Sequence, residues 1–375
     1  MDFPANYDEI VYRIDKIDPI QYSKTRNYID GNITYLSPYI SRGVISVKQV
    51  MEAVLAKGYK PYEITKFIQE LAWREYFQRV WQHLEDDMFD DIRITRTGIR
   101  HRQIPQAIIT AKTGIESIDT AINDLYQTGY MHNHIRMYTA SIACNIAKGH
   151  WQLPSQWMYY HLLDGDLASN TCSWQWVAGS FSSKQYFCNQ ENINKYTYSK
   201  QKDTIIDKSY DEIPLMEIPN ILTRTSSLQL TTALPGKTKP TFDHNLPLVL
   251  YNSYNLDPLW RNDIAANRLL VLEPSHFKQY PVSEKVIRFI IELAANIDGL
   301  QLFIGEINEI PDLAKFPAIY SKEHPAFNYY PGKKDEREWM FPGVTGMFNS
   351  FFSFWKKCEQ QLKNMKAIQL ELIRA

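Results

Sequence analysis

The chain contains no long apolar run, and its positive and negative charges nearly cancel. No stretch of about eighteen consecutive apolar residues, the length of a membrane-spanning helix, occurs in the 375 residues. The first ten residues, MDFPANYDEI, have neither the basic nor the apolar region of a secretion signal. We therefore expect a cytoplasmic protein with no membrane partner. With a formal net charge of −1, nucleic-acid binding cannot be predicted from overall charge and would need a local basic patch.

Cysteine is scarce, and it lacks the spacing of metal or disulfide motifs. The four cysteines, at Cys144, Cys172, Cys188 and Cys358, form no C-x-x-C pair. In a long chain this pattern argues for reduced, buried thiols and against a disulfide framework, a zinc site or an iron–sulfur cluster. We expect no metal site.

Aromatic side chains, by contrast, are abundant, at 13% of the residues with 24 Tyr and 9 Trp. They suit a protein that stacks on planar ligands or bases, although aromatic residues are more often part of a core. Apolar residues at 44% and charged residues at 22% are ordinary for a globular protein. A chain of 375 residues exceeds the size at which one core usually keeps growing, so we expect two domains.

Helical periodicity dominates the first half of the chain. Apolar residues recur at helical spacing from 44 to 84, with Gly58 and Pro61 separating two helices. The same spacing returns over 116–145 and 155–163. We expect residues 1–200 to form a helical domain.

The second half changes character. Residues 201–245 become rich in Ser, Thr, Pro and Lys without a clear period, which predicts an extension and a linker. Short apolar runs then predict strands at 246–252, 268–274, 300–306 and 318–321, with a helix at 283–297. We expect a smaller α/β, Rossmann-like domain over 246–375, with a final helix at 347–372.

Residues 128–176 carry the densest chemistry. They include TGYMHNHIRM and, further on, KGHWQLPSQWMYYHLLDGDLASNTCSWQWVAG. Asp164 and Asp166 flank Gly165 on a turn, where carboxylates can accept hydrogen bonds from ligand N–H and hydroxyl groups. A calcium-binding turn is the alternative, but the other oxygen ligands of such a loop are missing. The segment also carries four indoles that could form a wall or an electron path: Trp151, Trp157, Trp174 and Trp176.

Four blocks in order resemble the FAD-binding core of the photolyase/cryptochrome family. They read NITYLSPYISRGVIS at 32–46, QELAWREYF at 69–77, TGYMHNHIRM at 128–137, and LLDGDLASN followed by WQW at 162–176. The resemblance covers roughly residues 20 to 200 and implies an all-helical FAD-binding domain with FAD as cofactor. In most members an α/β antenna domain precedes this domain. Here the α/β region follows it, so the order is reversed, and we assign no antenna chromophore.

The resemblance also implies which residues contact the flavin. Asp166 would hold the polar edge of the ring, Asp164 would pair with Arg136 beside it, and Asn170 would face the reactive ring nitrogen. The other implied contacts are Tyr22, Thr34, Leu36, Ser37, Arg74 and Asn133. Ile33 and Tyr35 depart from the small hydroxyl and basic residues that are usual in the family.

By the same resemblance, Trp174 and Trp151 are the inner and middle members of a chain that passes electrons to photoexcited flavin. The outer member falls near Gly98, where no tryptophan stands. Either a tyrosine replaces it or the chain is shorter here. Core packing alone is the alternative role for both indoles.

Five residues match the family's cavity for a flipped cyclobutane pyrimidine dimer: Glu70, Trp73, Asn133, Met137 and Trp176. The two indoles would form aromatic walls, Met137 a soft contact, and Glu70 and Asn133 hydrogen bonds to base edges. Flipping is feasible because a damaged pair is already weakly stacked. Asn133 and Met137 argue against the (6-4) branch, whose members carry histidine there.

Arginines cluster just after the acidic run at 85–91. They could neutralise DNA phosphates at the rim of the cavity, or simply balance that run in a solvated loop. The cluster comprises Arg93, Arg96, Arg100 and Arg102.

The function we expect is blue-light repair of pyrimidine dimers in UV-damaged DNA by reduced FAD, as in a deoxyribodipyrimidine photolyase. Two alternatives stay open. One is a cryptochrome-type photoreceptor that signals to a protein partner, and the other is a relative that binds FAD or DNA without photochemistry. The residues expected to carry the chemistry of repair are Trp174, Trp151, Asn170 and Glu70.

Overall fold

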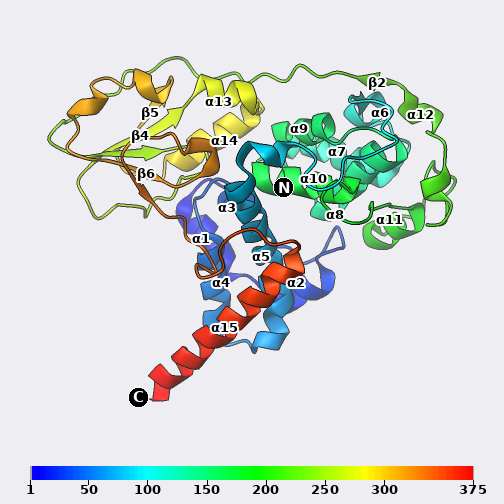
Figure 1. Ribbon diagram of the computed structural model, residues 1–375, viewed down its shortest axis with the longest axis horizontal. Coiled ribbons are helices and arrows are strands. Elements are labelled where there is room, and N and C mark those ends of the chain that lie inside the picture. The colour runs from blue at the N-terminus through cyan, green and yellow to red at the C-terminus, as the bar shows by residue number, and fades with distance from the viewer. Residues whose placement is uncertain (1, 375) are drawn as a thin grey trace.

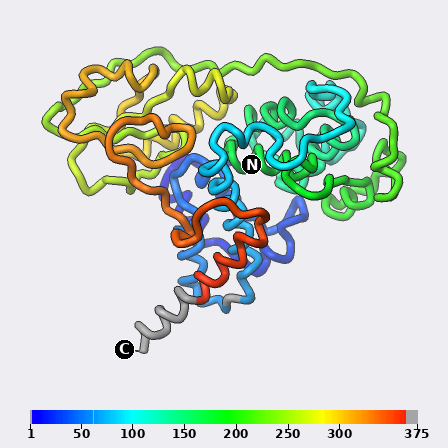
Figure 2. The backbone as a smooth tube through the Cα atoms, in the orientation of Figure 1, coloured from blue at the N-terminus to red at the C-terminus, as the bar shows by residue number. Residues whose placement is uncertain are grey.

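Helices form the first half of the chain and a parallel sheet follows them, so the protein belongs to the α + α/β class predicted from the sequence. The computed structural model describes residues 2–374, with side chains for residues 2–60 and 62–363. Figure 1 shows three lobes, two helical and one α/β, with the linker running across the top of the view. Figure 2 traces the chain through them in that order and back to the first lobe at its end.

The first lobe is built around the long helix α5 (Pro61–Leu84). Helix α2 starts where the Asp18 carboxylate accepts hydrogen bonds from the amides of Ile20 and Gln21, with Pro19 at the first helical position. The C-terminal helix α15 (Phe351–Arg374) packs against α5. The lobe contains α1 (Tyr7–Asp15), α2 (Pro19–Thr25), α3 (Ser37–Ser41), α4 (Val47–Ala56) and α5 (Pro61–Leu84).

The helical spacing predicted over 116–145 is confirmed, and the structure divides it into two helices at Gly129. Gly129 has a φ of +75°, the left-handed conformation that terminates helices. The His132 imidazole then caps the next helix, which runs into a π-helical turn at Ile142–Ile146. The second helical lobe contains α6 (Gln106–Ile109), α7 (Glu116–Thr128), α8 (Asn133–Ser141), α9 (Gln152–His161), α10 (Leu167–Ala178), α11 (Gln190–Thr197) and α12 (Asn220–Thr223). The short strands β1 (Ile104–Pro105) and β2 (Thr225–Ser226) pair antiparallel.

The α/β domain holds a parallel sheet in the order β5-β4-β3-β6-β7. The four predicted strands correspond to β3 (Leu248–Tyr251), β4 (Asn267–Leu272), β5 (Leu300–Ile304) and β6 (Ile319–Lys322). The predicted helix is α14 (Glu284–Ala294), and α13 (Pro274–Gln279) precedes it. Strand β7 (Lys333–Asp335) was missed because its sequence, KKD, is polar and largely exposed. The strand order reverses between β3 and β6, and ligands of such sheets bind at the carboxyl ends of strands at this point.

The α/β domain shares a buried core with the first helical lobe and with parts of α9 and α10, whereas other residues between 104 and 222 form a second core. Tyr39 of α3 lies 6.0 Å from Phe289 of α14, measured between ring centroids. Gly43 approaches the Tyr254 carbonyl so closely that a Cβ atom would lie 2.2 Å from its oxygen. The packing of the α/β domain against the first helical lobe therefore depends on backbone contact as well as on side chains.

The second half of the predicted linker is extended and is held along its length. Thr232 exchanges hydrogen bonds with the backbone of Val282, and Thr241 pairs with Gln301. Among residues 2–374, no helix has the length and apolarity needed to cross a membrane. The four cysteines are buried and unpaired, and burial raises the pKa of the Cys144 thiol to about 12.

Candidate functional site

Two arginine–aspartate pairs meet at the turn between α9 and α10. Arg136 of α8 donates from Nη2 to both Asp164 carboxylate oxygens, at 3.0 and 2.9 Å. Arg74 of α5 places Nη2 3.2 Å from the Asp166 carboxylate and donates to the Ser41 hydroxyl. Both arginine side chains are 19% exposed, while the carboxylates are nearly inaccessible. Each pair therefore keeps a guanidinium group fixed at the edge of solvent.

The turn itself is clamped by neighbouring elements. The Ser41 hydroxyl donates to the Asp164 carbonyl, and Arg42 donates to the Leu163 carbonyl. Asp166 caps α10 by accepting from the Ser169 amide at 2.7 Å, and it also accepts from Gln78 of α5. The two carboxylates are thus held in place by the helices on both sides.

Asn170 lies one turn into α10 with its amide orientation fixed. Its Nδ2 donates to the Ser155 carbonyl at 3.0 Å, which leaves its oxygen to accept from a ligand. Two other buried polar atoms, Ser169 Oγ beside it in sequence and His132 Nε2 at the start of α8, have no hydrogen-bond partner in the described part of the chain. Burial lowers the pKa of His132 to about 4, so this imidazole is neutral at physiological pH.

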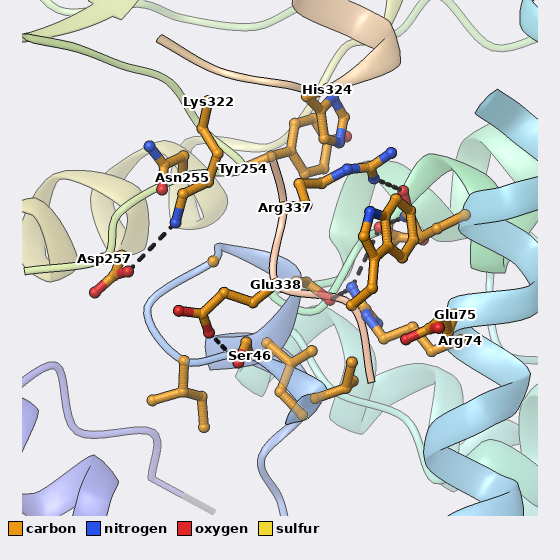
Figure 3. Close-up of a pocket in the computed structure, with 18 residues that line it drawn as sticks. Ser46, Arg74, Glu75, Tyr254, Asn255, Asp257, Lys322, His324, Arg337 and Glu338 are labelled. Carbon is orange, nitrogen blue, oxygen red and sulfur yellow. Dashed lines mark hydrogen bonds and ion pairs between the residues drawn. The ribbon is translucent and has the colours of Figure 1, made fainter. Parts of the chain in front are cut away.

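A cavity adjoins each pair. The first, of about 120 Å³, is lined by Arg74 and Asp166 together with residues at the carboxyl ends of β3 and β6, among them Tyr254, Lys322 and His324 (Figure 3). The second, of about 570 Å³, lies between α7 and the chain before α3. Its walls include Tyr130 and Met131, and the Arg136 guanidinium lies 5.4 Å from the Tyr130 ring centroid and bonds the Met131 carbonyl.

The residues predicted to contact a dimer stand on the same two helices as the arginines. On α5, Glu70 and Trp73 lie within one turn of Arg74, and on α8, Asn133 and Met137 lie within one turn of Arg136. Glu70 is paired with Arg26 and Lys66, at 3.1 and 2.9 Å. Asn133 is exposed, and Met137 and Trp176 are half-buried. Trp73 stacks on Phe351 of α15, with ring centroids 3.7 Å apart and planes within 10°.

Residues 67–210 match the family pattern described as the FAD binding domain of DNA photolyase. This segment belongs to the photolyase/cryptochrome family. A deoxyribodipyrimidine photo-lyase of Synechococcus sp. is 31% identical over 169 residues, which are 42% of this chain and 35% of that protein. Another, of Halobacterium salinarum, is 27% identical over 214 residues, which are 54% and 44% of the two chains. The chain thus spans less than half the length of either relative.

Two solved structures are similar over about half of the chain. The cryptochrome of Synechocystis sp. is 21% identical with a TM-score of 0.47, over 52% of this chain and 44% of that one. A class III photolyase of Agrobacterium tumefaciens is 26% identical with a TM-score of 0.42, over 50% and 41%.

FAD is the cofactor of this photolyase-type domain, and the donor set described above fits it. Flavin offers ring N–H and carbonyl groups, ribityl hydroxyls and a pyrophosphate. The two arginines, the Asn170 carbonyl and the unpartnered hydroxyl and imidazole atoms supply matching donors and acceptors. Of the remaining predicted flavin residues, three lie at or just before the start of α3 and Tyr22 lies on α2. Thr34 and Ser37 stand at the start of α3, Leu36 is buried between them, and Tyr22 packs edge-on against Phe67.

The sequence pattern of the photolyase domain did not single out the aromatic wall of the larger cavity. Tyr130 packs against Phe3 and Tyr35, with ring centroids 5.5 and 5.6 Å away. Tyr35 adopts a φ of +53°, a strained conformation for a residue with a side chain. Tyr130 lies inside the TGYMHNHIRM block and could have been predicted from that position, whereas Phe3 precedes every recognisable block.

The two predicted electron-transfer indoles of the photolyase domain are both buried. Trp174 of α10 and Trp151, at the start of α9, are each 2% exposed, and the two helices pack together. The Trp151 indole N–H donates to the Asp91 carboxylate at 2.8 Å. Gly98, the expected position of the outer member, lies in an exposed loop.

The arginine cluster divides into two groups. Arg96 is partly buried and donates to the carbonyls of Cys144 and Gly149, and burial lowers its pKa. Arg93 donates to the Asn349 carbonyl ahead of α15. Arg100 and Arg102 are exposed. Arg93 is exposed as well, but the Asn349 carbonyl engages its guanidinium group.

Proposed function

We propose that the protein repairs cyclobutane pyrimidine dimers in DNA with light and reduced FAD. The observation that carries the proposal is the arrangement of α5 and α8. Each helix presents an arginine bound to the α9–α10 turn and, within one helical turn of it, the residues expected to hold a dimer. A dimer bound there would lie beside the flavin-binding residues, as electron transfer between them requires.

When bound, FAD supplies the photoexcitable electron donor for this reaction, and the protein side chains position and tune the reactants. Trp73 offers one face to a base, because Phe351 covers the other. Among the described residues, Arg26 and Lys66 both pair with Oε1 of Glu70, which leaves Oε2 without an ion-pair partner. That oxygen can accept a hydrogen bond from a pyrimidine N–H.

A photoreceptor without repair activity is the second candidate. Two features favour it: α15 packs over the face of Trp73, and the Glu70 carboxylate is already engaged by two cations. Both features would reduce the room and the charge available to a dimer. A relative that binds FAD or DNA without photochemistry is the third.

Two variants separate these candidates. Trp174→Phe should abolish photoreduction of FAD under either photochemical function, whereas Glu70→Ala should impair repair and spare photoreduction. Loss of a specific hydrogen bond to a base lowers repair by about tenfold or more. Trp157→Phe and Gln69→Ala are the matched controls, since Trp157 is an equally buried indole and Gln69 adjoins Glu70 on α5. Unimpaired repair in Glu70→Ala would refute the assignment of the dimer cavity.

A further inference from the structure

The Trp151 indole is hydrogen-bonded to a carboxylate near the surface. Its Nε1 donates to Asp91 Oδ1 at 2.8 Å, while the ring itself is 2% exposed. The Asp91 side chain is 11% exposed, so its carboxylate stands between the buried indole and solvent. Hydrogen bonds from N–H groups to ionised carboxylates are shorter and stronger than neutral ones.

The loop that carries Asp91 is fixed by the helix that carries Trp174. Gln175, fully buried on α10, donates from Nε2 to the carbonyls of Met88 and Asp90 at 2.9 Å. Its Oε1 accepts from the Ile92 amide, also at 2.9 Å. Because the amide group of the buried Gln175 makes all three of these hydrogen bonds to the loop, it holds the Asp91 carboxylate at the indole N–H.

No aromatic ring continues the path outward from Trp151 among the ring contacts of the described residues. Its ring partner is His150, at 5.6 Å, whose Nε2 lies 3.9 Å from Asp91. Burial, reinforced by the charge of Arg102, lowers the pKa of His150, so this imidazole is neutral. A neutral imidazole is much harder to oxidise than an indole, and an electron vacancy that reaches Trp151 therefore stays there.

We propose that Asp91 is the proton acceptor that stabilises oxidised Trp151. This inference rests on the proposed photoreduction of FAD through Trp174. Trp151 loses one electron, through Trp174, to photoexcited flavin as the oxidant. The Nε1–H bond then breaks, the proton bonds to Asp91 Oδ1, and a neutral indolyl radical remains. An exogenous thiol later returns one electron, becoming a thiyl radical and losing its own proton to solvent, while the Asp91 proton returns to Nε1 and restores the indole.

The consequence is a shorter chain that works without an outer tryptophan. One-electron oxidation makes the indole N–H strongly acidic, so transfer to a carboxylate already in hydrogen-bond contact is favourable. Return of the electron would then also require return of the proton. Proton transfer therefore takes the place of a third indole in slowing charge recombination.

Transient absorption of the FAD-loaded protein after a blue flash tests the proposal. Wild type should show a tryptophan radical cation that converts to the neutral radical, more slowly in D₂O. Asp91→Asn keeps a hydrogen-bond acceptor but no base, and the conversion should slow by about a hundredfold. Asp90→Asn, an exposed neighbour, should behave as wild type. Neutral radical formation at the wild-type rate in Asp91→Asn would overturn the inference.

A cofactor-free measurement checks the contact itself. The indole ¹H–¹⁵N resonance of Trp151, assigned with Trp151→Phe, should move upfield in Asp91→Ala because the hydrogen bond is lost. An unchanged resonance would also overturn the inference. Absence of any tryptophan radical in the flash experiment on wild type, with FAD bound, would instead refute the proposed photoreduction, so the two failures are distinguishable.

Discussion

At the scale of single residues, the Arg136–Asp164 pair has the largest expected effect on stability. Both oxygens of the Asp164 carboxylate are bonded to one guanidinium nitrogen, and the carboxylate is almost inaccessible. Removing one member of such a pair leaves the other charge without its partner, which costs more than the pair itself contributes.

We expect Asp164→Asn to lower the free energy of unfolding by about 2–3 kcal/mol, below the full cost for a buried pair because Arg136 retains some solvent contact. Urea unfolding of the FAD-free protein measures this change. Glu52→Gln is the control, because the Lys48–Glu52 pair is exposed and 3.9 Å long, and its loss should change stability by less than about 0.5 kcal/mol. Equal effects of the two substitutions would contradict the buried character of the site.

Single residues also mark how far the sequence could predict the site. The Arg136–Asp164 pair was expected, and it is present. Gln78, Gln175 and Asp91 were not expected, although each bonds a residue named beforehand or the loop beside it. Glutamine and aspartate on helical or acidic stretches normally face solvent, so nothing in their local pattern indicates a contact that forms about 60 to 90 residues away in sequence.

At the scale of elements, the packing of α15 against α5 could not be predicted from the sequence. A final helix was predicted at 347–372, but not the stacking of Phe351 on Trp73 of α5. The Glu75 carboxylate fixes the approach to α15 by accepting from the amides of Met340 and Phe341. Burial raises the pKa of Glu75, and these amide hydrogen bonds counteract that rise.

Phe351 and Phe352 form a matched pair for testing this contact, since they are 3% and 70% exposed. We expect Phe351→Ala to lower the free energy of unfolding by about 3 kcal/mol or more, and Phe352→Ala to change it by less than about 0.5 kcal/mol. Phe351→Ala should also weaken binding of dimer-containing DNA, because the Trp73 indole loses its backing ring. Tighter binding would instead show that α15 obstructs the site.

The positions of the strands could be predicted from the local sequence, whereas their order in the sheet could not. Runs of apolar residues predicted β3 to β6, because a buried parallel strand reads as a continuous apolar segment. The order of the strands and the docking of the sheet on the first helical lobe depend on contacts such as Gly43 against Tyr254. Such contacts leave no periodic trace in the sequence.

At the scale of the whole molecule, two neutral histidines lie where the α/β domain meets the first lobe. His324 stacks on Tyr254 and meets Trp81 of α5 edge-on. His276 has no partner for Nε2 within the described residues, and burial, with the charge of Arg42, lowers its pKa to about 3. Burial likewise lowers the pKa of His324 well below its ordinary value.

These pKa values predict an acid-sensitive fold. Between the ordinary histidine pKa and the lowered one, the unfolded chain binds a proton that the folded protein does not. Stability therefore falls as pH decreases from about 6.5, by about 1.4 kcal/mol per pH unit for each such histidine. Urea unfolding between pH 6 and pH 4.5 measures how the free energy of unfolding changes per pH unit. This pH slope should be smaller by that amount in His276→Gln than in wild type. His83→Gln, at an exposed position on α5, should leave the slope unchanged. An undiminished slope in His276→Gln would mean that His276 is not held neutral by the fold.

We propose that the arrangement of α5, α8 and α10 serves the repair of DNA. The most direct test gives photoreduced, FAD-loaded protein a thymine-dimer oligonucleotide, in blue light and in the dark, and follows thymine absorbance and the repaired strand by chromatography. We predict light-dependent recovery of intact thymines and none in the dark. No recovery, from protein that holds FAD and photoreduces it, would contradict the repair function and leave the photoreceptor as the better account.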